Sequence, residues 1–171
     1  MKKYFFIFFL LFYYTNSVAE EKIFYLDVNF LLTQSEAGKY INSELKKIND
    51  KNIEEYQNIE KSIKTEEENI LKQKNILKED EYKLKVNNLR DKYNSYQKLK
   101  NTKNNNLKLL RNDAGNQILK IVNEILSEYS SKNKISLIME KKNVVIGKTE
   151  LDITKNILEL LNKKIKKVEL K

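Results

Sequence analysis

The chain of 171 residues contains no cysteine, no histidine and no proline, and it has only three glycines. The absence of cysteine excludes disulfide bonds and thiol nucleophiles, and the absence of histidine excludes His-based metal sites. There is no EF-hand loop and no glycine-rich phosphate-binding loop, although carboxylates alone could still bind Ca²⁺ or Mg²⁺. Because no nucleophile–base pair or metal constellation can be assembled, we expect a protein that is not an enzyme, needs no cofactor and holds no metal.

The N-terminus has the pattern of an export signal. Lys2 and Lys3 precede an uncharged apolar run at residues 4–14, and small residues ending at Ala19 form a cleavage site. The alternative is a membrane anchor, but this run of eleven residues is shorter than the roughly 20 that a spanning helix needs. We therefore predict a signal peptide over residues 1–19, cleaved after its last residue.

The absence of proline matters most over residues 35–129, where apolar side chains recur at helical spacing. Short β-branched and aromatic segments flank this stretch at residues 22–28, 135–140 and 143–147. If these strands share one sheet, the chain must leave and return as two antiparallel helices. The predicted fold is therefore mainly α: a long antiparallel helical hairpin, called the arm, on a small β body of about three strands plus a C-terminal helix.

We place the arm at residues 36–129 and the body at residues 20–35 and 130–171. In the body, residues 135–147 should form a β-hairpin, and Asp152 should cap the last helix. The body core, shared with other subunits in an oligomer, should consist of the apolar side chains of the strands. These are Ile23, Phe24, Tyr25, Leu26, Val28, Leu137, Ile138, Met139, Val144, Val145 and Ile146.

The two halves of the arm align in one antiparallel register. Partners whose residue numbers add to 152 bring apolar residues together, for example Tyr56 with Tyr96, and put the tip near Ile76, at about residues 76–79. The same register pairs acidic with basic residues. The pairs it predicts are Glu54–Lys98, Glu60–Lys92 and Glu67–Lys85.

Two further features of the arm lead to predictions. Gly38 and Gly115 lie nearly opposite each other in this register. The pair can indicate a close approach of the two helices, or Gly38 can merely mark a break before the long helix. Residues 98–106 are polar and contain poor helix formers. We expect this middle segment to be soft and able to bend.

Charge is segregated along the arm. Residues 54–68 carry six glutamates, whereas residues 83–111 are strongly basic. Pairing between the two helices accounts for part of this pattern, and the excess of cations would attract acidic chains or anionic lipid. The candidate client- or anion-binding residues are Lys83, Lys85, Arg90, Lys92, Lys98, Lys100, Lys103, Lys108 and Arg111.

Several segments carry a family resemblance. They are IFYLDVNFLL at 23–32 with SEAGK at 35–39, ILKEDEY at 76–82, ISLIMEKKNVVIG at 135–147 and LDIT at 151–154. In this order and spacing, the chain resembles the Skp (OmpH-like) periplasmic chaperones of Gram-negative bacteria over essentially the whole mature chain.

The resemblance implies a jellyfish-like homotrimer in the periplasm, with a shared β-barrel body and three arms around a basic cavity. It implies ATP-independent holding of unfolded outer-membrane β-barrel proteins, which prevents their aggregation. Nucleic acid is not an expected partner of an exported protein. Two alternatives remain open: a structural coiled-coil protein of the envelope, and a module that binds anionic lipid or lipopolysaccharide surfaces.

Overall fold

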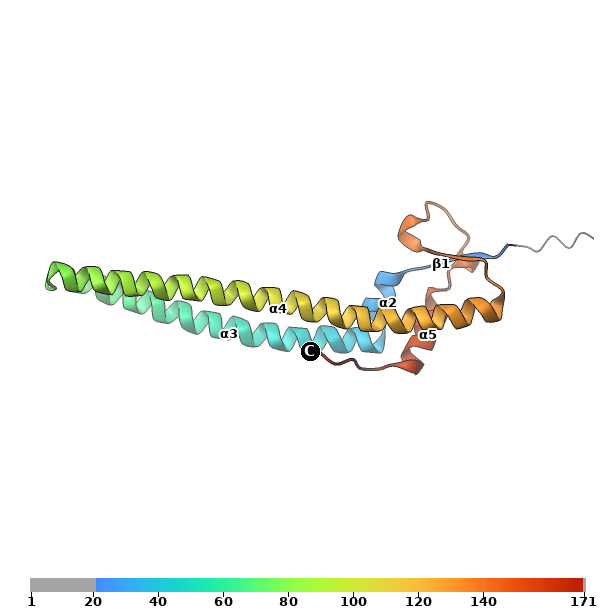
Figure 1. The fold of residues 1–171 in the computed structure, drawn as a ribbon, viewed down its shortest axis with the longest axis horizontal. Helices are drawn as coiled ribbons and strands as arrows, with labels where there is room; N and C mark the ends of the chain where they lie inside the picture. The colour runs from blue at the N-terminus through green and yellow to red at the C-terminus, as the bar shows by residue number, and fades with distance from the viewer. Residues whose placement is uncertain (1–20, 171) are drawn as a thin grey trace, which may run out of the picture.

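The computed structural model describes residues 21–170, so the predicted signal peptide lies outside the described residues. Two long helices dominate the molecule: α3 (Glu36–Gln73) and α4 (Glu79–Asn133) run antiparallel and form the arm (Figure 1). At 1.5 Å per residue, α3 is about 57 Å long. The predicted helical hairpin is confirmed. Within residues 21–170, no helix combines the length and the apolar character needed to cross a bilayer.

The chain reverses in the short segment between the two helices, which contains Ile76. This residue is 82% exposed. The returning helix α4 starts with Glu79, Asp80 and Glu81 in its first turn. Carboxylates at this end interact favourably with the helix dipole, which helps to start the helix immediately after the turn.

At the base of the arm, a short helix α2 (Val28–Gln34) precedes α3, and Ser35 separates them. The Ser35 hydroxyl oxygen accepts the N–H of Gly38 at 3.0 Å, which caps α3. A Cβ atom on Gly38 would overlap the backbone carbonyl of Leu32, whereas one on Gly115 would have no neighbour within 4 Å. Of the two interpretations, the break at Gly38 is therefore correct, and a close helix approach at Gly115 is wrong.

Most of the buried apolar side chains lie where the base of the arm meets the body. They come from α2, from the first turns of α3, from the last third of α4 and from α5 (Thr154–Lys164). The core residues are Leu26, Leu31, Ala37, Ile41, Leu45, Ala114, Ile118, Val122, Ile125, Ile153, Ile157, Leu161 and Val168. The arm is thus held at one end.

The sheet of the body has two strands, β1 (Ile23–Leu26) and β2 (Leu137–Glu140), which pair in parallel. The whole arm is the connection between them. The predicted β-hairpin at residues 135–147 is wrong: a 3₁₀ turn, η1 (Lys141–Asn143), follows β2, and Val145 and Ile146 are almost fully exposed. The turn takes residues 144–147 out of register with β2, whose second edge therefore stays unpaired in the described chain.

Asp152 links the body segments just before α5. Its carboxylate accepts the backbone N–H of Thr154 at 2.9 Å and the Nζ of Lys141 at 2.7 Å, although the cap position itself is taken by Ile153. Partial burial acts to raise the pKa of Asp152, but the hydrogen bonds from Lys141 and Thr154 outweigh it and lower the pKa overall. A second 3₁₀ turn, η2 (Thr149–Leu151), precedes it.

The middle of the arm contains few buried apolar side chains. On α4 no residue is buried between Tyr96 and Ala114, and on α3 the only buried residue between Leu45 and Tyr56 is the polar Asn52. The helix α4 nevertheless continues without a break through residues 98–106. The softness of this segment stays a prediction, and the sparse packing gives it a physical cause.

Replacing Gly38 with alanine should destabilise the protein by about 1–3 kcal/mol, because the new methyl group meets a backbone carbonyl that cannot move aside cheaply. The matched change Gly115→Ala should stabilise it by up to about 1 kcal/mol, because alanine is the better helix former and the space is open. Urea unfolding followed by circular dichroism measures both. Equal effects of the two substitutions would show that the packing at Gly38 is not tight.

Backbone amides of residues 98–106 should exchange with deuterium faster than those of residues 114–125 near the base. The variant Asn52→Leu should slow exchange in the middle segment at least about fivefold, because an apolar side chain would fill the gap in the seam. The exposed Asn58→Leu change on the same helix serves as the control and should have little effect. Equal protection of the middle and the base in the unaltered protein would contradict the prediction.

Candidate functional site

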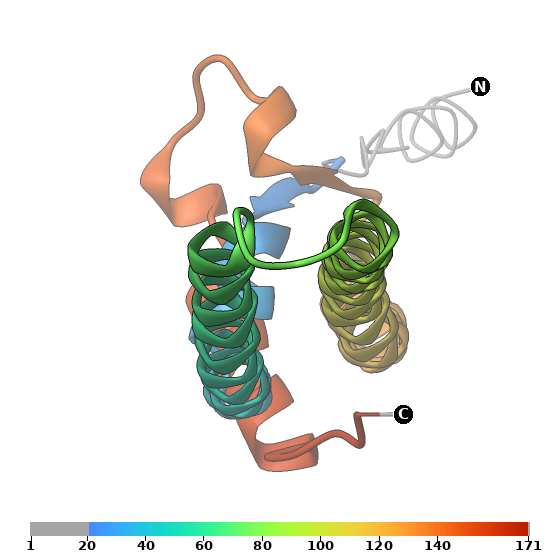
Figure 2. The same cartoon turned by 90° about the vertical axis from the view of Figure 1, so that its left-hand side faces the viewer.

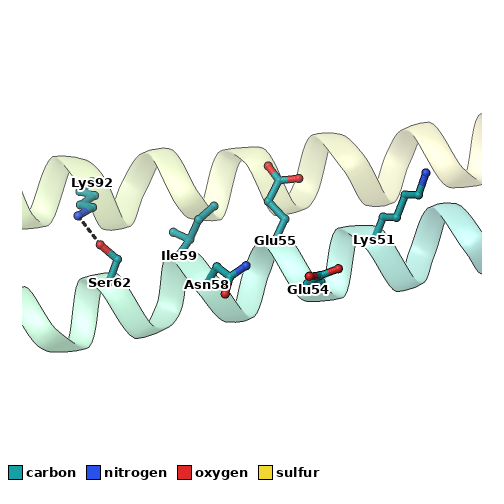
Figure 3. Close-up of a pocket in the computed structure, with 7 residues that line it drawn as sticks. All are labelled: Lys51, Glu54, Glu55, Asn58, Ile59, Ser62 and Lys92. Atoms are coloured by element: carbon teal, nitrogen blue, oxygen red, sulfur yellow. Dashed lines mark hydrogen bonds between the residues drawn. The ribbon is translucent and has the colours of Figure 1, made fainter.

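On one side of the arm, lysines of α4 contact acidic and polar side chains of α3 and so bridge the two helices. Lys92 of α4 contacts Glu66 at 2.7 Å and Ser62 at 3.0 Å on α3, and Lys103 pairs with Glu55. Figure 3 shows the Lys92–Ser62 contact and the position of Glu55 along the same side. We call these five residues the ion-paired flank.

The observed ion pairs differ from the predicted ones. Glu54–Lys98, Glu60–Lys92 and Glu67–Lys85 are not among the salt bridges of the described chain; Lys92 binds Glu66 instead, and Glu60 lies 3.9 Å from Lys100. Side chains on a helix tilt toward its N-terminus, so lysines on α4 reach toward the tip and glutamates on α3 reach toward the base. A lysine therefore pairs with a glutamate that lies closer to the tip than the residue directly opposite it in the backbone register.

The apolar register itself is supported at mid-arm by an aromatic contact. The rings of Tyr56 and Tyr96 meet edge to face with centroids 6.2 Å apart, as the predicted pairing requires. The Lys100 ammonium lies 5.6 and 5.7 Å from the two ring centroids. The Tyr96 hydroxyl donates to Glu60, and this hydrogen bond is the main reason that the pKa of Tyr96 is raised. The buried Tyr56 hydroxyl has no hydrogen-bond partner.

The nine candidate cations of the arm fall into two groups. Lys83 pairs with Glu79, Lys85 donates to Gln73, and Lys92, Lys100 and Lys103 have the partners given above. The other four take part in no salt bridge within residues 21–170. They are Arg90, Lys98, Lys108 and Arg111.

Two of the unpaired cations line a groove near the base of the arm, and the groove also contains a cation that the sequence did not single out, Lys46. We call it the basic groove. Its seven lining residues are Asn42, Leu45, Lys46, Asn49, Leu107, Lys108 and Arg111. Lys46 was missed because only the returning helix stood out as basic. The signal that could have found it is the antiparallel register, which places it within two residues of Lys108 along the arm.

The predicted body core is divided between buried and exposed side chains. Leu26 is buried, and Phe24, Val28 and Ile138 pack partly against the core, while Tyr25 and Val144 are half-buried. The others are exposed in the single chain, and Figure 2 shows the loop after β2 standing away from the helices. The exposed members are Ile23, Leu137, Met139, Val145 and Ile146.

These surface features suit contact with other macromolecules. Within residues 21–170 there is no group of three or more acidic side chains placed to hold a metal ion. The described surface offers instead unpaired cations along the arm and exposed apolar side chains on the body. Both are properties of surfaces that contact other macromolecules.

Comparisons with known proteins agree with this arrangement. A crystal structure described as a "putative outer membrane chaperone (OmpH-like)" from Caulobacter crescentus CB15 has a similar fold, with a TM-score of 0.79 at 17% sequence identity. The match covers 88% of this chain and 89% of that one. No curated protein matches the sequence. The family model for outer membrane protein (OmpH-like) matches residues 22–161, and the chain therefore belongs to the OmpH-like family.

Proposed function

We propose that this protein is an ATP-independent periplasmic chaperone that holds unfolded outer-membrane β-barrel proteins in a basic cavity between the arms of a homotrimer. The observation that carries the proposal is the combination of a long arm with unpaired cations and a body whose apolar side chains remain exposed in one chain. Family membership supports the chaperone role, and the similarity to the Caulobacter protein adds to that support.

Exposed apolar side chains of the body support the proposed trimer. Val145 and Ile146 are almost fully exposed, and Leu137 on β2 is 49% exposed. A two-stranded sheet is rarely stable alone, and β2 has β1 as its only described neighbour. Other copies of the chain that supplied strands to this edge would cover these side chains and leave three arms pointing the same way.

The positive charge of the arm supports the proposed capture of clients. An unfolded outer-membrane protein exposes apolar strands and is often acidic, so a basic arm increases the rate at which the two meet. Many weak contacts hold the client without imposing a structure on it, and release needs no nucleotide. The proposed export to the periplasm, with the signal peptide removed, brings the protein to such clients.

A second candidate, supported by the four unpaired arm cations, is binding to anionic lipid or lipopolysaccharide surfaces. In that case the cations would contact headgroups and the protein would bind vesicles in the absence of any client. A purely structural coiled coil is the third candidate, but it gives no reason for unpaired cations or for the sparse packing of the middle of the arm.

The chaperone proposal predicts that the mature chain suppresses the aggregation of an outer-membrane β-barrel protein diluted from urea, without ATP. Light scattering measures the effect, and raising the salt concentration during capture should weaken it because charge attraction is screened. Scattering equal to that without the protein would contradict the proposal. Binding to phosphatidylglycerol vesicles in the absence of client binding would favour the lipid alternative.

The proposed assembly predicts that the double change Val145→Asp and Ile146→Asp abolishes most of this suppression, because buried unpaired carboxylates would disfavour association of the bodies. The arm should stay helical by circular dichroism. Leu71→Asp, at an exposed apolar residue near the tip of the arm, serves as the control and should retain activity. Full activity of the double variant would show that this loop is not part of an interface.

A further inference from the structure

The basic groove differs from the rest of the arm surface in its charge balance. None of its seven lining residues is acidic, and Lys46, Lys108 and Arg111 take part in no ion pair of the described chain. Asp50, one turn beyond Lys46, is exposed but does not line the groove. Three cations thus face a shared space without a counter-charge from the chain.

The groove and the ion-paired flank lie on different sides of the hairpin. Asn49 of the groove and Glu55 of the flank are six residues apart on α3, which at 3.6 residues per turn is about one and two-thirds turns. On the flank, Lys92 and Lys103 already have acidic partners. The arm therefore has one side whose lysines are neutralised internally and one side whose cations remain available to an external ligand.

The other lining residues favour a peptide over a compact anion. Asn42 and Asn49 each offer an amide that donates and accepts, which is what the backbone of an extended chain requires. The half-buried Leu107 supplies the apolar part of the groove, with the nearly buried Leu45 beneath it. A phosphate group would use the cations and leave the amides and leucines without a role.

The dimensions fit a short extended segment. From Asn42 to Asn49 the helix rises about 10 Å at 1.5 Å per residue. This is the length of about three residues of an extended chain, at about 3.4 Å each. Successive side chains of such a segment point to opposite sides, so a carboxylate can meet the cations while its neighbour contacts the leucines.

We propose that the basic groove binds short, extended segments of unfolded polypeptide in which acidic residues alternate with apolar ones. The inference deepens the proposed chaperone function and rests on it: it names the place on the arm where a client is held. Arg111 can bind a carboxylate with two parallel hydrogen bonds, and Lys46 and Lys108 add charge from either helix.

The test uses the mature protein and a fluorescein-labelled peptide that alternates glutamate with phenylalanine, followed by fluorescence anisotropy. The triple variant Lys46→Gln, Lys108→Gln and Arg111→Gln should bind it at least about tenfold more weakly. The control variant Lys61→Gln, Lys64→Gln and Lys72→Gln removes the same charge from exposed lysines of α3 outside the groove and should bind within about threefold of the unaltered protein. Circular dichroism verifies that both variants fold.

A peptide with glutamine in place of glutamate should bind the unaltered protein at least about tenfold more weakly. Equal losses in the two triple variants would overturn the inference, because binding would then follow net charge alone. Groove-dependent binding to phosphatidylglycerol vesicles without binding of the peptide would also overturn it, in favour of a lipid ligand. If the unaltered protein suppresses client aggregation but the groove variant binds peptide normally, the inference fails while the proposed function stands; if aggregation is not suppressed, the proposed function itself fails.

Discussion

The apolar packing at the base of the arm is the interaction on which the rest of the structure depends. It joins β1, α2, α3, α4 and α5 in one cluster, in which Leu31, Ile118 and Ile157 are completely buried. A side chain of this kind contributes about 1.5–3 kcal/mol when it leaves water. Beyond this cluster the arm has only Tyr56, Ile70 and Tyr96 as buried apolar residues on its seam. The arm can therefore be polar along most of its length because its position is fixed at the base.

This arrangement leaves the surface of the arm available for recognition. On the ion-paired flank, lysines of α4 and carboxylates of α3 neutralise one another and hold the two helices in register. On the side of the basic groove the cations have no internal partners. The two sides of the hairpin therefore differ in available positive charge. In an assembly of several arms, this difference would decide which side faces a captured chain.

The main features of the fold could be predicted because they depend on periodicity along the sequence. Helical spacing and the matching of apolar residues placed Tyr56 against Tyr96 and the reversal close to Ile76. Ion-pair partners could not be predicted from the backbone register alone, because each side chain tilts toward the N-terminus of its helix and so meets a partner that is not directly opposite. The third strand was wrong because a 3₁₀ turn follows β2 in place of a tight hairpin turn, and Val145 then lies exposed beside no strand. Lys46 escaped notice because a groove is formed by two helices and only one of them is rich in basic residues.

The proposed association of several copies through their bodies would account for both the exposed apolar residues of the body and the length of the arm. The most direct measurement is the native mass of the mature protein, determined by light scattering coupled to size-exclusion chromatography. The account predicts a mass close to three times that of one chain. A mass equal to that of a single chain would contradict it, because no cavity could then form between arms.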